Sequence, residues 1–367
     1  MKTIRTRIKE IAFATLYPLF RLLPLKSGYI LFNCDNGKRF SDNPLALYTE
    51  LKNNSRDYQY IITLNNNQFE KNTCIPYMSI RYLYYLATSK YLVSNVNMYS
   101  GLRVRKNQVY LETWHGTPLK RIGDDIIDDE RKKEKQEWLL DASHWTYFLS
   151  NAPISNQDYE SAFHINPNII LDYGLPRNDN LTSDTQLYNA FRSKRNIIDR
   201  KVILYAPTFR DNGTTVNFNF KKFAEQLGDE YYLLINFHRL YEVHTIENIS
   251  NVEFNDKLTI EDCMKVADIL VTDYSSVMFD YALLERPMVF YPYDFDYYSK
   301  EDRGFYFDYT QTVPGPIFYD QDKMMSFFKS VQSGDFNIAR VKQFAKQFNA
   351  NAEQRNASER VIRRVFD

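Results

Sequence analysis

One histidine stands where it could transfer a proton. It is His115, in the segment TWHGTPLK at 113 to 120, which follows an apolar run that ends near Thr113. An imidazole titrates near neutral pH and can accept a proton from a hydroxyl group as that oxygen attacks phosphorus. Gly116 would let the backbone approach a ligand. A lone histidine after a strand is more often structural, so the role depends on other motifs.

Two serines stand between a second apolar run and a predicted helix that contains Asp280. They are Ser275 and Ser276, in the segment TDYSS at 272 to 276. Hydroxyl groups and unpaired N–H groups at a helix N-terminus can bind a diphosphate without a Walker lysine. Simple N-capping by Ser276 explains the same residue. The two roles are compatible, and both place this segment at the start of the helix.

Basic side chains follow two further strands. The segment APTFRD at 206 to 211 supplies Thr208 and Arg210, and the segment NFHR at 236 to 239 supplies His238 and Arg239. Both arginines are candidates to offset diphosphate charge, and His238 could donate a hydrogen bond to the leaving phosphate. Each arginine alone is more often a surface ion-pair partner. Four polar turns, all following strands, favour a shared site.

No metal or other cofactor is predicted. Asp294 and Asp296 match the Asp-x-Asp pattern of metal-dependent glycosyltransferases, but this spacing is common by chance and magnesium would need further oxygen ligands. Cys34, Cys74 and Cys263 lie far apart, with no spacing typical of a zinc site. Free thiols suit a reducing compartment.

The elements that would position these residues form two α/β series. Apolar runs at 29–33, 60–64, 91–94, 109–113, 146–150 and 169–173 predict the strands of a first doubly wound lobe, at 28–185. Runs at 202–205, 232–236, 269–272 and 288–291 predict a second lobe, at 186–335. A polar span at 178–200 would hold the linker, and residues 336–367 read as a C-terminal helix that could pack back on the first lobe. Ligands of such lobes bind at the carboxyl ends of the strands, so we expect a cleft there.

Residues 1–27 predict an amphipathic segment that lies on a membrane. Apolar residues recur at steps of three and four, and basic residues surround them. The apolar run is too short to span a bilayer. We expect an anionic membrane surface to bind Arg5, Arg7, Lys9, Phe13 and Phe20. A helix packed on the protein's own lobe is the alternative. Because 46 basic and 46 acidic side chains balance, nucleic acid is not an expected partner.

Together these residues resemble the CDP-glycerol glycerophosphotransferase family of teichoic acid synthesis. The resemblance covers about residues 28 to 330 and rests on TWHGTPLK at 113, GLPRND at 174, YAPTFRD at 205 and TDYSSVMFDYALLERPMVFY at 272. It implies a GT-B fold, CDP-glycerol as donor, and His115 and His238 as catalytic residues. The family often has His-Pro-Arg where this chain reads His238-Arg239-Leu240, which leaves the role of Arg239 open.

The remaining site residues fall into two groups. On the donor side we expect Thr208, Arg210, Arg239, Asp273, Ser275, Ser276 and Asp280. On the acceptor side or lining the cleft we expect Trp114, Gly116, Thr117 and Arg177.

The first predicted strand begins near residue 29, whereas polymerases of the family usually carry a sizeable extra region before the transferase portion. The length of this chain is therefore expected to suit a primase. By resemblance, a primase adds the first glycerol phosphate to the ManNAc-GlcNAc disaccharide on undecaprenyl diphosphate, as a peripheral protein on the cytoplasmic face of the cell membrane. An enzyme that adds a later unit, or one that uses CDP-ribitol or a nucleotide sugar, is an alternative. Outside enzymes, the alternative is a catalytically silent lectin or membrane scaffold.

Overall fold

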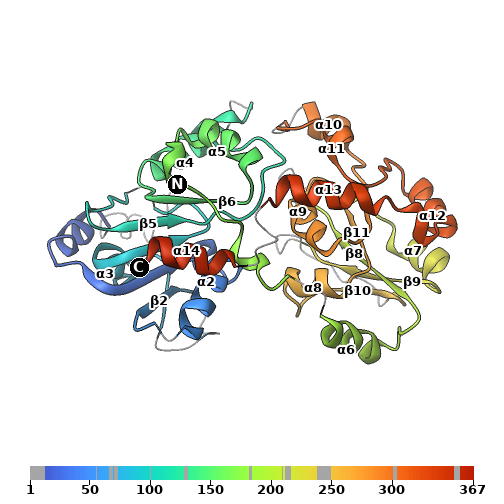
Figure 1. Cartoon of the computed structure of the whole chain (residues 1–367), viewed down its shortest axis with the longest axis horizontal. Helices are drawn as coiled ribbons and strands as arrows, with labels where there is room; N and C mark the ends of the chain where they lie inside the picture. The colour runs from blue at the N-terminus through green and yellow to red at the C-terminus, as the bar shows by residue number, and fades with distance from the viewer. Residues whose placement is uncertain are drawn as a thin grey trace, which may run out of the picture. The chain divides into compact units, whose positions relative to one another are not determined.

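Strands and helices alternate along the chain, and the chain divides into two units (Figure 1). The computed structural model describes residues 13–54, 56–65, 69, 73–99, 101–127, 131–181, 184–208, 210, 216–237, 249–300, 304–350 and 356–367. Unit 1 comprises Met1–His115, Ile122–Asn180 and Asn351–Asp367, and unit 2 comprises Gly116–Arg121 and Leu181–Ala350. The chain therefore passes from unit 1 to unit 2 at the peptide bond after His115.

Unit 1 is built on a parallel sheet. Within the described residues its strand order is β3-β2-β1-β4-β5-β6-β7. The strands are β1 (Lys26–Asn33), β2 (Gln59–Thr63), β3 (Cys74–Ile75), β4 (Ser89–Ser94), β5 (Val109–Glu112), β6 (Tyr147–Ser150) and β7 (Ile170–Asp172). The order reverses between β1 and β4, which is the switch point where ligands of open α/β sheets bind.

Helices cover both faces of this sheet because successive residues of each buried strand point to opposite sides. Leu31 of β1 faces a core formed with α3 (Ile80–Thr88), α4 (Lys132–Ala142) and α5 (Asn156–Phe163). Its neighbours Ile30 and Phe32 face a second core, formed with α2 (Asp42–Asn53) and α14 (Ala357–Val365). In Figure 1 α14, drawn in red, lies next to α2.

Unit 2 repeats this design with a shorter sheet. Its described strands have the order β10-β9-β8-β11-β12, again parallel, with the switch point between β8 and β11. The strands are β8 (Lys201–Ala206), β9 (Tyr231–Ile235), β10 (Val252–Phe254), β11 (Ile269–Thr272) and β12 (Met288–Phe290). The helices are α6 (Thr185–Arg195), α7 (Phe220–Leu227), α8 (Ile260–Val266), α9 (Val277–Tyr281), α10 (Phe295–Lys300), α11 (Tyr309–Thr312), α12 (Gln321–Ser330) and α13 (Ile338–Phe348).

The unit boundaries differ from the predicted domains in three places. The polar span expected as linker contains helix α6, which packs Phe191 into the core of unit 2. The predicted C-terminal segment is shared: α13 belongs to unit 2, where Phe344 packs on Phe279, while α14 belongs to unit 1. Gly116–Arg121, expected in the first lobe, groups with unit 2 because Leu119 is buried there and Lys120 pairs with Phe305.

The N-terminal segment packs partly on its own unit. Residues 13–20 are helical. Phe13 is 3% exposed in the core of unit 1, so its predicted contact with a membrane is corrected. Phe20 lies edge-on to Tyr84, at 5.6 Å between ring centroids. Leu22 remains 81% exposed. Arg5, Arg7 and Lys9 lie outside the described residues, among which no helix combines the length and hydropathy needed to cross a bilayer.

Candidate active site

His115 lies at the carboxyl end of β5, close to the switch point of unit 1. The strand ends at Glu112, and Thr113 then bonds to the end of β4 through its N–H and its hydroxyl, at 2.7 and 3.0 Å from the Ser94 carbonyl oxygen. Trp114 follows with a φ of 52°, in the left-handed region that a tryptophan seldom adopts. This turn places His115 beside the loop that follows β4.

A backbone hydrogen bond fixes which ring nitrogen of His115 carries the proton. Its Nδ1 atom lies 2.8 Å from the carbonyl oxygen of Asn95. A carbonyl oxygen can only accept, so Nδ1 is protonated and donates, and Nε2 keeps its lone pair. The imidazole is therefore held in the tautomer that a general base requires.

The environment keeps the ring neutral. Desolvation has the largest effect and lowers the pKa of His115 below its ordinary value of 6.5, although the residue is exposed to solvent. The hydrogen bond to Asn95 and the charge of Asp42 raise the pKa, but they do not outweigh desolvation. At neutral pH the unprotonated imidazole dominates, and that is the form able to accept a proton.

Trp114 and Asn43 hold the turn from two sides. The indole stacks on the His115 ring, with centroids 4.2 Å apart, and it is buried against Trp138 and Phe163. The Asn43 side-chain amide donates to the carbonyl oxygens of Thr113 and Trp114, at 3.2 and 3.3 Å. The main chain on both sides of the left-handed residue is thus anchored in a buried environment.

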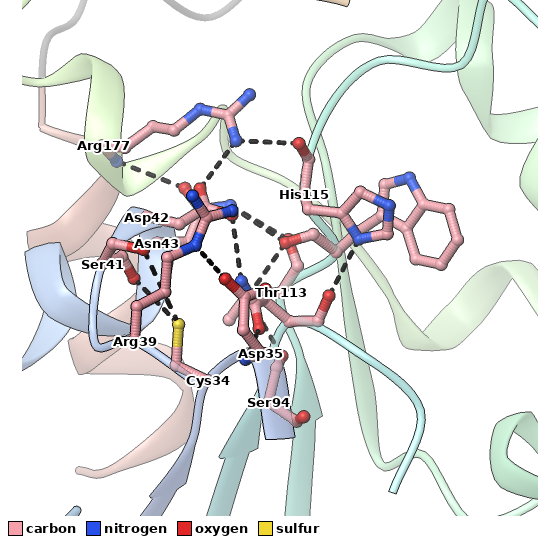
Figure 2. Close-up of polar contacts among 12 residues, drawn as sticks. Cys34, Asp35, Arg39, Ser41, Asp42, Asn43, Ser94, Thr113, His115 and Arg177 are labelled. Carbon is pink, nitrogen blue, oxygen red and sulfur yellow. Dashed lines mark hydrogen bonds and ion pairs between the residues drawn. The ribbon is translucent and has the colours of Figure 1, made fainter. Parts of the chain in front are cut away.

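Arg177 links His115 to Asp42. In Figure 2 its guanidinium lies near both the Asp42 carboxylate and the His115 carbonyl oxygen, and Nη1 donates to them at 2.6 and 2.9 Å. Asp42 also accepts from the Asn95 side chain at 3.1 Å. Burial alone would raise the pKa of Asp42, but Arg177 and Asn95 outweigh it and the pKa lies below its usual value. Asp42 is therefore an anion, and its ion pair with Arg177 holds the guanidinium next to His115.

The switch point of unit 2 uses a similar arrangement. Asp273 follows β11 and is 1% exposed, and its Oδ1 accepts from the backbone N–H groups of Thr208 and Tyr274, at 2.8 and 2.5 Å. In unit 1, Asn95 follows β4 and its Oδ1 accepts from the Asp35 N–H at 3.0 Å. A buried polar side chain thus fixes a neighbouring loop in each unit. In unit 1 it follows β4 and fixes the loop after β1, and in unit 2 it follows β11 and fixes the loop after β8.

The Arg210 side chain is held by carboxylates of its own unit. Its guanidinium is buried and donates to Asp273 at 2.8 Å, to Asp294 at 2.7 and 3.0 Å, and to the Thr208 carbonyl oxygen at 2.7 Å. Burial lowers the pKa of Arg210, but the two carboxylates outweigh it and the pKa is raised. These contacts make Arg210 the buried cation of Asp273 and Asp294, so it is not a surface ion-pair partner.

The serine segment lies where the sequence predicts it. Ser275 and Ser276 are half-buried and precede α9, whose first turn holds the buried Asp280. The Ser276 side chain makes no capping hydrogen bond, whereas the Ser275 hydroxyl accepts from the Val277 N–H at 3.4 Å. N-capping by Ser276 is therefore not the reason for a serine at that position.

The Asp-x-Asp segment is engaged by protein groups. Asp294 accepts from Arg210 and from the Tyr274 hydroxyl, the latter at 3.1 Å. No group of three or more metal-binding side chains occurs among the described residues. An open cavity of about 540 Å³ is lined by Tyr293, Asp294, Phe295, Asp296, Tyr297 and Tyr319.

The structure brings Trp114, His115 and Arg177 into contact in unit 1, and it places Thr208, Asp273, Ser275, Ser276 and Asp280 in unit 2, where Thr208 bonds to Asp273. Gly116 and Thr117 are buried in unit 2. His238 and Arg239 lie outside the described residues. Sequence reasoning missed Asp42, Asn43 and Asn95. Asn95 directly follows a predicted strand, the same signal that pointed to His115.

Comparisons with known proteins decide the family. The sequence profile of the CDP-Glycerol:Poly(glycerophosphate) glycerophosphotransferases matches residues 15–367. This chain belongs to that family. Membership confirms the resemblance seen in the sequence and the expectation that this glycerophosphotransferase uses CDP-glycerol.

Individual relatives of this glycerophosphotransferase agree with that result. It is 33% identical to the teichoic acid glycerol-phosphate transferase of Staphylococcus aureus, over 99% of this chain and 100% of that protein. It is 28% identical to the teichoic acid glycerol-phosphate primase of Bacillus subtilis, over 80% and 77% of the two chains. A solved variant of the wall teichoic acid polymerase TagF with CDPG superposes with a TM-score of 0.85 at 27% identity, over 100% of this chain and 98% of that one. The GT-B fold is thereby confirmed.

Proposed function

We propose that this chain transfers sn-glycerol 3-phosphate from CDP-glycerol to the ManNAc-GlcNAc disaccharide on undecaprenyl diphosphate, with release of CMP. The observation that carries the proposal is the state of His115. Its Nδ1 proton is committed to the Asn95 carbonyl oxygen, which leaves Nε2 as the base at the edge of the sheet. Family membership supplies the donor.

The proposed reaction is one in-line displacement. Nε2 of His115 takes the proton of the acceptor hydroxyl while its oxygen attacks the glycerol-bearing phosphorus of CDP-glycerol. The bond from that phosphorus to the bridging oxygen breaks, and the electron pair leaves with CMP. The negative charge that develops on CMP then needs hydrogen-bond donors.

Unit 2 would supply those donors. Ser275 and Ser276 follow β11 at its carboxyl end, where α/β sheets bind ligands. Ser276 is the N-cap residue of α9, but its side chain makes no capping hydrogen bond, which supports a ligand-binding role for its hydroxyl. By resemblance, His238 would add a further donor.

We propose that the reaction needs no metal cofactor. Asp294, one of the two acids in the Asp-x-Asp segment, is paired with Arg210 and Tyr274. A chelator should therefore leave CMP release unchanged. A loss of activity that added magnesium restores would overturn this part of the proposal.

Replacement of the base is the direct test. His115→Ala should reduce CMP release by about 10² to 10⁴-fold, the range typical of a lost general base, and leave CDP-glycerol affinity nearly unchanged. His164→Ala is the matched control, because His164 is an exposed histidine of the same unit that pairs with Asp124 in a surface contact. Near-normal turnover by His115→Ala would remove His115 from the base role.

Two acceptors are candidates. The B. subtilis relative is a glycerol-phosphate primase, whereas the S. aureus relative is named only as a glycerol-phosphate transferase. Lipid-linked disaccharide analogues with no glycerol phosphate and with one unit already attached, assayed side by side, separate them. Faster CMP release on the bare disaccharide supports the primase, and faster release on the extended one supports addition of a later unit. Competition by CDP-ribitol tests the donor.

We also propose that the chain works as a peripheral protein at the cytoplasmic face of the cell membrane. Leu19 and Leu22 are 58% and 81% exposed beside Arg21, which supports contact with an anionic surface. Vesicles of anionic phospholipid should bind the full chain and release a Leu19→Ser/Leu22→Ser variant. Intact binding by a chain that lacks residues 1–25 would end the membrane role of this segment.

A further inference from the structure

A buried carboxyl group, that of Glu112, bonds to the turn that carries His115. Glu112 is the last residue of β5, and its side chain is fully buried, at 0% exposure. Its Oε1 atom accepts from the backbone N–H of Trp114 at 2.9 Å. That N–H belongs to the left-handed residue whose indole stacks on the His115 ring. Glu112 therefore touches the turn that orients the base, without contacting the imidazole.

A chain of hydrogen bonds anchors Glu112 in the core. Its Oε2 atom lies 3.4 Å from the Tyr110 hydroxyl, which donates to Asp141 at 2.8 Å. The indole Nε1 of Trp145 also donates to Asp141, at 2.9 Å. Two carboxyl groups thus share one phenol in a buried site, where two charges of the same sign are costly.

The hydrogen bonds indicate where the proton of this pair resides. Asp141 receives two donors, which stabilise its charged form, whereas Glu112 receives the Trp114 N–H and a long contact. Burial raises the pKa of Glu112 well above its usual value and that of Asp141 to about 6. Glu112 interacts electrostatically with Asp141, Tyr110 and Asp42, and Asp141 also interacts with Tyr110, Tyr77 and Tyr82. A neutral Glu112 can donate to the Tyr110 oxygen while that hydroxyl donates to Asp141.

We infer that Glu112 is a positioning residue for the reaction, which as an uncharged acid holds the Trp114 turn and thereby keeps the His115 imidazole stacked on the Trp114 indole. The inference rests on the proposed role of His115 as the base. It assigns a catalytic purpose to a strand residue that does not face the substrate. An uncharged amide should serve in place of the acid, because one acceptor and one donor are all that the contacts require.

Three variants of β5 test this inference. Glu112→Gln keeps both contacts, and Glu112→Leu fills the same space but removes the acceptor for the Trp114 N–H. Gln108→Leu is the matched control, because Gln108 is equally buried and its amide donates at 2.8 Å to the carbonyl oxygens of Leu86 and Ser89, before the strand begins. Each variant is assayed for CMP release, CDP-glycerol affinity and the pKa of His115, measured by NMR titration of the ring in the full chain.

We expect Glu112→Gln to keep kcat within about twofold and the His115 pKa unchanged. Glu112→Leu should lower kcat by up to about 10²-fold, the loss that a misplaced catalytic group can cause, with donor affinity retained. Its His115 pKa should rise toward 6.5 because the ring becomes better solvated. Gln108→Leu should lower thermal stability and change neither kcat nor the His115 pKa.

Two results would overturn the inference. If Glu112→Gln is as impaired as Glu112→Leu, the ionised carboxylate is required and the uncharged role is wrong. If Glu112→Leu behaves like Gln108→Leu, Glu112 is only structural. Should Glu112→Leu not fold, Tyr110→Phe frees Glu112 from its anchor and should raise the His115 pKa to a smaller extent. The NMR titration needs no turnover, so it still reports on positioning if His115→Ala proves active and the base role fails.

Discussion

Removal of the Arg210 charge should destabilise unit 2 and not simply weaken donor binding. The guanidinium is 3% exposed and bonds to both Asp273 and Asp294. Arg210→Met keeps an apolar side chain of similar length but leaves two carboxylates without their cation. Breaking a buried pair from one side costs about 3 to 5 kcal/mol, because the remaining charge stays desolvated.

That free energy corresponds to a large shift in thermal unfolding. For a domain of this size, 1 kcal/mol shifts the melting temperature by about 2 to 4 °C, so Arg210→Met should melt about 6 to 20 °C lower. Adding Asp273→Asn and Asp294→Asn should restore part of the loss, because an amide keeps the acceptors and removes the stranded charges. Lys342→Met is the control: Lys342 pairs with Glu285 in a half-exposed contact of the same unit, worth about 0 to 1 kcal/mol.

Calorimetry without ligand and titration with CDP-glycerol separate the two readings of Arg210. The structural role predicts a lower melting temperature in the absence of any nucleotide. A melting temperature within about 3 °C of the wild type, together with a large loss of CDP-glycerol affinity, would refute it. That result would return Arg210 to the diphosphate, as its position after a strand first indicated.

The remaining predictions concern unit 1. Asp42 raises and Arg177 lowers the pKa of His115. Asp42→Asn should therefore shift the acid limb of the pH–kcat/KM profile to lower pH, and Arg177→Gln should shift it to higher pH. Shifts of the same sign in both variants would contradict this electrostatic account. Asp179→Ala should lower the free energy of unfolding of unit 1 by about 1 kcal/mol, because the Asp179 carboxylate accepts from the Ala357 and Ser358 N–H groups at the start of α14, both at 2.8 Å. Denaturant titration measures the loss, and Asp179→Asn, which keeps an acceptor, should recover most of it.

The alternation of apolar runs predicted most of the fold. The strands that form the centre of each sheet are buried on both faces, so their sequences are continuous apolar runs. One edge strand of each described sheet escaped this signal: β3 has two residues, Cys74 and Ile75, and β10 is only partly buried. Helix α6 was missed because its exposed face is polar, and a single buried Phe191 with Arg192 marks its inner side.

The sequence located the site but not the direction of its side chains. The positions of His115 and Arg177 in unit 1 and of the serine segment in unit 2 were predicted because each follows a strand, at the edge where a parallel sheet binds ligands. Position after a strand does not tell whether a side chain points to a ligand or into the loop that supports it. Arg210 and Asp273 point inward, and no period or spacing distinguishes them from residues that point outward.

A comparison of the two switch points explains why the residue after β11 is paired with an arginine and the residue after β4 is not. Asn95 fixes the Asp35 loop as a neutral amide: its oxygen accepts from Asp35, its nitrogen donates to Asp42, and no charge needs compensation. In unit 2 the Asp273 carboxylate fixes the loop after β8. It accepts hydrogen bonds from two backbone N–H groups but, unlike an amide, cannot donate one. A buried carboxylate requires a cation. Arg210 is therefore a consequence of the aspartate, so a donor-side arginine in this chain has to be sought outside the contacts that Asp273 imposes.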